Sequence, residues 1–181
     1  MRRLILFRHA KAAHRARGGT DRDRPLEPVG QREAEISGRW MAATGLAPDL
    51  VLVSPSARTV QTWDEVKTHF PRAKVEVLDD LYDATPEDIE MAIAGPTRAA
   101  QDVLLIGHNP GMQELAMNLL VEGGASSDEV EKVAGGFPTS TVAVIAMGEG
   151  GAARLEAMFN PRRDTPPPYV EAWDEEPGAG S

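Results

Sequence analysis

Cysteine is absent from the 181 residues of this chain, which excludes disulfide bonds, thiolate nucleophiles and zinc–thiolate sites. The chain has only four histidines, and they show neither HExxH nor HxH spacing. We therefore expect a protein that works without a metal ion and without a cofactor.

Long apolar runs and an excess of positive charge are also missing. The N-terminal apolar run is four residues long, too short for a signal peptide, and no segment approaches the roughly 20 apolar residues that cross a bilayer. The formal net charge is −9, and no basic stripe with interleaved aromatic residues occurs. We expect a cytoplasmic protein that binds neither nucleic acid nor membrane, whereas the oligomeric state does not follow from these features.

Short apolar runs that alternate with helical patterns define the fold class. A hydrophobic content of 41% suffices for one domain with a sizeable core. Runs at 4–7, 50–53 and 102–106 have the composition of strands buried on both faces. The remaining expected elements are helices at 27–44 and 55–69, an exposed strand at 74–78, a helix capped by Thr85, a helix ending near Gly123, a short helix after Ser126, and strands at 141–147 and 154–159. This order predicts an α/β fold, a three-layer α/β/α sandwich whose mostly parallel central sheet has an antiparallel edge.

Polar and cationic residues follow each of the three buried strands. Arg8 and His9 follow the first, Arg58 lies five residues after the end of the second in the first turn of a helix, and His108 follows the third. If these strands are parallel neighbours, the four side chains meet in one crevice at the carboxyl edge of the sheet. The planar guanidinium groups of arginine and the N-termini of helices at this edge favour the binding of a phosphoryl group.

Two residues at these junctions are typical of helix N-caps. Ser54 precedes Pro55, and Asn109 precedes Pro110, which matches a cap followed by proline at the first helical position. The sequence therefore predicts helices that begin at these two prolines.

The motifs resemble those of the histidine phosphatase superfamily, which is also called phosphoglycerate-mutase-like. The resemblance extends from residue 1 to about residue 162 and is carried by Arg8-His9, Ser54-Pro55 with Arg58 and Gln61-Thr62, and Gly107-His108. Further motifs are similar to those of the small bacterial phosphohistidine phosphatases, namely Arg24-Pro25-Leu26 with Gly30, Gly107-His108-Asn109-Pro110-Gly111, Phe137-Pro138-Thr139 and Pro161-Arg162. Residues 1–162 are accordingly expected to form a histidine phosphatase catalytic domain, and residues 163–181 a proline-rich acidic tail.

The resemblance implies a role for each residue of the crevice. His9 is expected to attack phosphorus and form a phosphohistidine enzyme, and neighbouring positive charge should keep its imidazole neutral. Arg8, Arg58 and His108 would bind the phosphoryl oxygens. Family phosphomonoesterases use a carboxylic acid after the middle strand as general acid, and Asp80 is nearest to that position, although its neighbours lack the usual glycine-rich pattern. Asp80 could equally belong to a simple turn that ends a strand.

Several other residues have ordinary structural interpretations. Arg24 could be a third phosphate-binding arginine or could pin its loop through Asp21 or Asp23. His14 could line the mouth of the site or be exposed to solvent, and His69 is expected at a helix C-terminus. The spacing of Trp40, Met41 and Trp63 is typical of the core face of a helix.

The leading functional hypothesis is a metal-independent phosphatase that uses a histidine nucleophile. Its expected substrate is phosphohistidine in a phosphorelay or phosphotransfer protein, because a phosphoramidate needs a weaker general acid than an ester. Two alternatives remain, namely a phosphomonoesterase acting on a small phosphorylated metabolite, and a catalytically silent phosphate-binding module.

Overall fold

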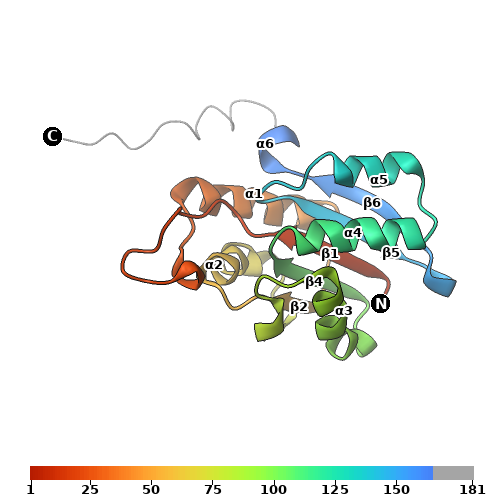
Figure 1. Cartoon of the computed structure of the whole chain (residues 1–181), viewed down its shortest axis with the longest axis horizontal. Coiled ribbons are helices and arrows are strands. Elements are labelled where there is room, and N and C mark those ends of the chain that lie inside the picture. Colours follow the sequence, from red (N-terminus) through yellow and green to blue (C-terminus); the bar gives the residue numbers. More distant parts are fainter. Residues whose placement is uncertain (165–181) are drawn as a thin grey trace.

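A single six-stranded sheet forms the centre of the computed structural model, which describes residues 1–164 (Figure 1). The strand order is β3-β2-β4-β1-β5-β6. The first four of these pair in parallel, whereas β5 pairs antiparallel with both β1 and β6. The strands are β1 (Arg3–Arg8), β2 (Leu50–Val53), β3 (Lys74–Val77), β4 (Asp102–Gly107), β5 (Val142–Met147) and β6 (Ala153–Phe159). The predicted mostly parallel sheet with an antiparallel edge is therefore confirmed.

Helices cover both faces of the sheet. They are α1 (Pro28–Ala43), α2 (Ala57–Val66), α3 (Pro86–Ala94), α4 (Gly111–Glu122), α5 (Ser127–Ala134) and α6 (Pro161–Asp164). Side chains of a strand alternate between faces, so Leu4 and Leu6 pack with α3, α4 and α5, whereas Ile5 and Phe7 pack with α1 and α2. These two cores give the predicted three layers.

The predicted starts of α2 and α4 are wrong by one to two residues. Helix α2 begins at Ala57, because the Ser54 hydroxyl lies 2.7 Å from His108 Nε2 and does not cap a helix. Helix α4 begins at Gly111, because Asn109 Nδ2 donates instead to the carbonyl of Phe137 at 3.1 Å. Both side chains serve long-range contacts, which local sequence patterns do not reveal.

The caps expected at Thr85 and Ser126 are present. Each hydroxyl accepts a hydrogen bond from the backbone N–H three residues later, and the carboxylate of Asp88 or Glu129 completes a capping box. Helix α2 continues as a 3₁₀ turn (Lys67–His69), so the helical segment ends where the sequence predicts.

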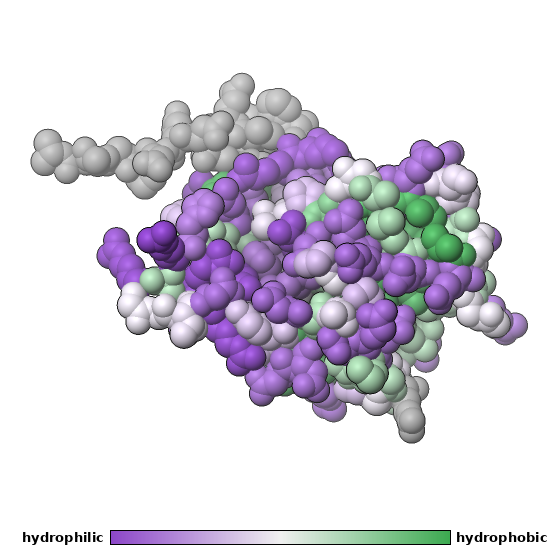
Figure 2. Space-filling view, in the orientation of Figure 1, coloured by the Kyte–Doolittle hydropathy of each residue, from purple (hydrophilic) through white to green (hydrophobic). Residues whose placement is uncertain are grey.

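The surface and the chain end add two observations. The face shown in Figure 2 is mostly hydrophilic, and within residues 1–164 no helix is long and apolar enough to cross a membrane. Of the predicted tail, Arg163 and Asp164 belong to α6, and residues 165–181 lie outside the described part of the chain.

Candidate active site

The carboxyl edge of the sheet brings the two histidines and Arg58 together. Since β4 lies between β2 and β1, residues that follow these strands become neighbours. The ring centroids of His9 and His108 are 5.3 Å apart, and Arg58 Nη2 lies 3.3 Å from His108 Nδ1. Arg8 ends β1 beside them.

The surroundings of His9 fix which of its nitrogens carries a proton. Its Nδ1 lies 2.8 Å from the carbonyl oxygen of Ala10, and a carbonyl can only accept. Nδ1 therefore holds the proton, and the lone pair is on Nε2. Thr62 holds the Ala10 peptide in place, since its hydroxyl accepts from Ala10 N and donates to Arg58 O.

His108 has the opposite tautomer. An arginine can only donate, so the contact from Arg58 makes Nδ1 of His108 the acceptor. Nε2 then carries the proton and donates to the Ser54 hydroxyl at 2.7 Å. Ser54 thus orients the imidazole. This role could not be predicted from the sequence, because a serine before a proline resembles a helix cap.

Both imidazoles are neutral at pH 7. Burial, against the opposing effect of the Ala10 carbonyl and with the added effect of the charges of Arg58 and Arg8, lowers the pKa of His9 to about 4. Burial, followed by the charge of Arg58, lowers the pKa of His108 to about 3. A neutral imidazole keeps the lone pair that a nucleophile needs.

Two arginines at this edge keep unused hydrogen-bond donors. Arg8 Nη1 donates to the Phe137 carbonyl at 2.7 Å, but the buried Nε has no partner, and no carboxylate within residues 1–164 pairs with this side chain. Burial lowers the pKa of Arg8. Arg58 is 3% exposed, and its Nε also lacks a partner. Buried cations with free N–H groups are suited to bind an anion.

Asp21 and Tyr82 hold Arg58 in place, and sequence reasoning did not identify either as a site residue. The Asp21 carbonyl accepts from Arg58 Nη1 at 2.9 Å, and its carboxylate lies 3.1 Å from Nη2. The Tyr82 hydroxyl donates to that carboxylate at 2.6 Å, and the Tyr82 ring packs edge-on against His108 at 5.6 Å. Arg24 Nε lies 2.9 Å from Asp21, as the loop-pinning alternative predicts.

A second support lies behind the β1 end. Ser140 has a positive φ of 66°. Its N–H donates a hydrogen bond to the carbonyl oxygens of both Arg8 and His9, each at 3.2 Å. Its hydroxyl donates to Glu33, a fully buried carboxylate of α1 that also pairs with Arg162. The sequence contained one signal for this network, the late Pro161-Arg162 motif, but no signal for Glu33.

Asp80 lies apart from the other candidates. It is exposed on the 3₁₀ turn (Asp79–Leu81) after β3 and makes no hydrogen bond or ion pair within the described part of the chain. A surface pocket next to it is lined by Asp79, Asp80, Tyr82, Asp88, Met91 and Ala92. Of these residues, Tyr82 contacts His108, and the role of Asp80 stays a prediction.

The remaining side chains singled out from the sequence have structural positions. His14 is exposed, and His69 Nε2 lies 3.0 Å from Glu35. Met41 is fully buried, Trp40 stacks on Phe159 at 4.7 Å, and Trp63 packs against the same core. Among residues 1–164, no group of three or more His, Asp or Glu side chains is arranged to hold a metal ion.

Known proteins are similar to this chain in sequence and architecture. The histidine phosphatase superfamily (branch 1) matches residues 4–94. The uncharacterized protein Rv1276c of Mycobacterium tuberculosis (strain H37Rv) is 34% identical over 162 residues, which cover 86% of this chain and all of that protein.

Solved structures extend the similarity. A protein of Agrobacterium tumefaciens assigned as the phosphohistidine phosphatase SixA is 33% identical, with a TM-score of 0.76 over 88% of this chain and 98% of that one. A structure of the protein histidine phosphatase SixA with tungstate is 25% identical, with a TM-score of 0.73 over 88% of this chain and 97% of that one. The chain described here belongs to the histidine phosphatase superfamily.

Proposed function

We propose that this protein is a metal-independent phosphatase that removes the phosphoryl group from phosphohistidine in another protein, through a phosphohistidine intermediate on His9. The observation that carries the proposal is the free lone pair on His9 Nε2, which lies beside two arginines with unused N–H donors. The similarity to SixA structures supports the substrate class.

The reaction has two in-line displacements. In the first, His9 Nε2 forms a bond to phosphorus while the P–N bond of the substrate breaks, and the departing imidazole takes a proton from solvent. In the second, water attacks phosphorus, the His9–P bond breaks, and phosphate leaves with the His9 lone pair restored. Arg8 and Arg58 offset the charge on the equatorial oxygens in both steps, which is the main contribution of a protein to this chemistry.

His108 changes its role when the phosphoryl group arrives. Without substrate, its Nδ1 accepts from Arg58. A phosphoryl dianion beside the ring would raise the pKa of His108, so that Nδ1 gains a proton and donates to a phosphoryl oxygen. Arg58 would then turn its donors to the same dianion.

The position of Asp80 supports a phosphoramidate rather than an ester substrate. An ester oxygen needs a proton as it leaves, and Asp80 is exposed and lacks contacts with the two histidines. A departing imidazole can be protonated by water, so the reaction needs no strong acid from the protein. A protein substrate located in the cytoplasm is part of this proposal.

The test compares phosphate release from a phosphohistidine peptide and a matched phosphoserine peptide at pH 7 with a chelator present. We expect a preference of at least about a hundredfold for phosphohistidine, since only the ester requires the missing acid. Equal or faster phosphoserine cleavage would overturn the proposal. Loss of both activities in chelator would show that the reaction needs a metal.

A phosphomonoesterase that acts on a small metabolite is the second candidate. Asp80 lies two residues from Tyr82, whose ring contacts His108, so a modest movement of the turn would bring a carboxylic acid toward the site. In that case Asp80→Asn would slow phosphoserine cleavage strongly while phosphohistidine cleavage stays unchanged. The third alternative, a silent phosphate-binding module, requires that wild-type protein bind phosphate without any turnover.

A further inference from the structure

The loop at residues 11–24 differs in charge from the rest of the chain. It contains five Lys or Arg side chains and two Asp side chains, whereas the whole protein has a net charge of −9. The loop follows the nucleophile directly and stands out from the body of the molecule at the left of Figure 1. In Figure 2, purple hydrophilic residues at this edge lie beside white and pale green ones.

This loop is anchored at its base and along its second half. The base is closed by a bridge between Ala12 and Leu26 and by a hydrogen bond of 2.9 Å from Ala13 N to Pro25 O. The second half forms a 3₁₀ turn (Asp21–Asp23), from which Asp21 contacts Arg58. The loop is therefore fixed relative to the phosphate-binding arginines.

Four of the five cations of the loop, its arginines, fall into two groups. Arg22 and Arg24 have partners, since Arg22 lies 3.6 Å from Asp79 and 4.4 Å over the Tyr82 ring, and Arg24 pairs with Asp21. Arg15 and Arg17 are exposed and make no hydrogen bond or ion pair anywhere in residues 1–164. These two guanidinium groups at the tip are free to meet another molecule.

Chain length limits how far the tip can be from the site. Arg17 precedes Asp21 by four residues, so its Cα lies within about 14 Å of a residue that contacts Arg58. A protein interface of standard size covers about 800 Å² on each partner, a patch roughly 30 Å across. A protein docked on His9 is therefore large enough to contact the tip as well.

We propose that Arg15 and Arg17 form a docking contact for a phosphoprotein whose surface around the phosphorylated histidine is acidic. This inference rests on the proposed function and names the kind of partner that the site serves. Opposite charges on the polar rims of two proteins increase the rate at which the proteins associate and the specificity of their pairing more than they increase the affinity. An extended polyanion such as RNA, or an anionic membrane, fits less well because the rest of the protein is negatively charged and would repel it.

The experiment uses three phosphohistidine peptides of equal length, with acidic, neutral or basic residues around the phosphohistidine, and free phosphoimidazole as a substrate without flanks. Each is tested with wild-type protein, with the double variant Arg15→Glu and Arg17→Glu, and with the control variant Arg72→Glu and Lys74→Glu. The control makes the same change of charge at exposed positions just before and at the start of β3, at the opposite edge of the sheet.

We expect wild-type kcat/KM to be about tenfold higher for the acidic than for the basic peptide at about 20 mM salt, and nearly equal at about 500 mM, because salt screens exposed charges. The loop variant should reverse this preference and hydrolyse phosphoimidazole at the wild-type rate. The control should keep the wild-type preference.

Three results would overturn the docking contact. These are a wild-type enzyme without peptide preference, a loop variant that keeps the preference, and a loop variant that also loses activity on phosphoimidazole. The loop variant could also keep the peptide preference but lose binding to RNA or to phosphatidylserine vesicles. This result would likewise overturn the proposal, because the partner of Arg15 and Arg17 would then be another polyanion and not an acidic protein. Absence of turnover on every phosphohistidine substrate would overturn the proposed function itself, and the docking contact with it.

Discussion

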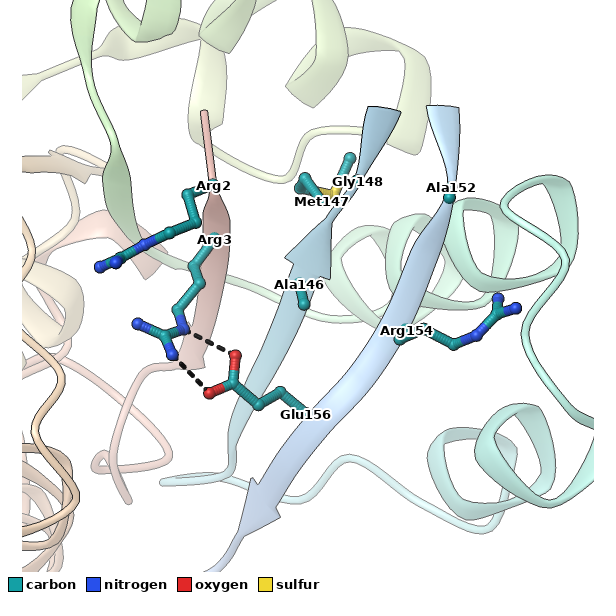
Figure 3. A pocket seen from close by; sticks show the side chains of 8 residues that line it. All are labelled: Arg2, Arg3, Ala146, Met147, Gly148, Ala152, Arg154 and Glu156. Atoms are coloured by element: carbon teal, nitrogen blue, oxygen red, sulfur yellow. Dashed lines mark hydrogen bonds and ion pairs between the residues drawn. The ribbon is translucent and has the colours of Figure 1, made fainter. Parts of the chain in front are cut away.

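Arginines lie at both ends of strand β1, but only those at one end have carboxylate partners. At the amino end, Arg2 Nε lies 2.9 Å from Asp102. Arg3 Nε lies 2.6 Å from Glu156 (Figure 3). These hydrogen bonds raise the pKa of both guanidinium groups. At the carboxyl end, Arg8 has no carboxylate partner within the described residues, and burial lowers its pKa.

The difference shows that neither arginine nor a pocket is sufficient to identify a phosphate site. The amino end has a pocket with a volume of about 300 Å³ and three arginines in its wall, yet Arg154 donates to two backbone carbonyls and the others are paired with acids. The charges of Arg2 and Arg3 are therefore already neutralised, and the Arg154 side chain is engaged by the backbone. Unused donors around a neutral histidine distinguish the carboxyl end, so anion chemistry is expected only there.

The largest expected effect comes from removing the nucleophile. His9→Ala should lower the rate of phosphohistidine cleavage by about 10⁴-fold or more, since the reaction loses its covalent route. Phosphate should still bind with an affinity close to that of the wild type, because Arg8 and Arg58 remain. Single-turnover kinetics and phosphate titration measure the two quantities. Unchanged turnover would remove the whole mechanism.

A matched pair of arginine variants tests the two ends of β1 directly. Arg8→Ala should reduce kcat/KM by ~10²–10³-fold, because its donors act on the charge that develops on the phosphoryl oxygens. Arg3→Ala should leave kcat/KM within about twofold and cost at most about 1 kcal/mol of stability, as expected for a partly exposed ion pair.

Steady-state kinetics and thermal unfolding of both variants decide this comparison. Similar kinetic losses in Arg8→Ala and Arg3→Ala would mean that the arginine at either end acts through the fold rather than on the phosphoryl group. The comparison of the two ends would then carry no functional meaning.

Local patterns were enough to predict the fold and the four residues at the strand ends. The runs at 4–7, 50–53 and 102–106 are apolar because both faces of the sheet are covered, so their strands and their parallel order could be expected. Residues that follow such strands must meet at one edge, which is why His9, Arg58 and His108 could be placed together.

The side chains that hold those residues could not be predicted, because their partners are far away in the sequence. Ser54 resembled a cap but bonds His108, 54 residues later. Asp21 meets Tyr82 over 61 residues, and Ser140 meets Glu33 over 107. Such contacts depend on how helices and loops pack on the sheet, and no periodicity in the sequence encodes them.

A smaller effect is expected where Tyr82 and Asp21 hold Arg58. Tyr82→Phe removes the hydroxyl that donates to Asp21 but keeps the ring against His108. We expect KM and the inhibition constant of tungstate to rise about three- to tenfold with little change in kcat, because a hydrogen bond to a partly exposed carboxylate contributes modestly. Asp21→Asn should act in the same direction. Wild-type tungstate inhibition in both variants would exclude this positioning role.

The last effect distinguishes the two ends of β1 by the pH range in which each loses stability. The pKa of His9 is about 4 in the folded protein and about 6.5 in an unfolded chain, so the unfolded state binds more protons between these values and stability falls as the pH falls. At pH 5 this amounts to about 2 kcal/mol for His9 alone. At the other end, burial alone would raise the pKa of Asp102, but the hydrogen bonds and charges of Arg2 and Arg3 more than offset this effect, so the pKa is lowered. The stability that the ionised Asp102 contributes is therefore lost only below about pH 4, where the carboxylate of the unfolded chain takes up a proton.

Thermal unfolding in phosphate-free buffer between pH 7 and pH 3 should therefore show a decline that begins near pH 6.5, from the two buried histidines, and to which Asp102 adds below about pH 4. His9→Gln should reduce the decline between pH 6.5 and pH 4, because the variant has no imidazole to protonate on unfolding, whereas the exposed His14→Gln should leave it unchanged. Asp102→Asn should reduce only the decline below pH 4. An equal decline above pH 4 in wild type and His9→Gln would mean that His9 is not held neutral by the fold. The contrast between a neutral histidine at the carboxyl end and ion pairs at the amino end would then lose its electrostatic basis.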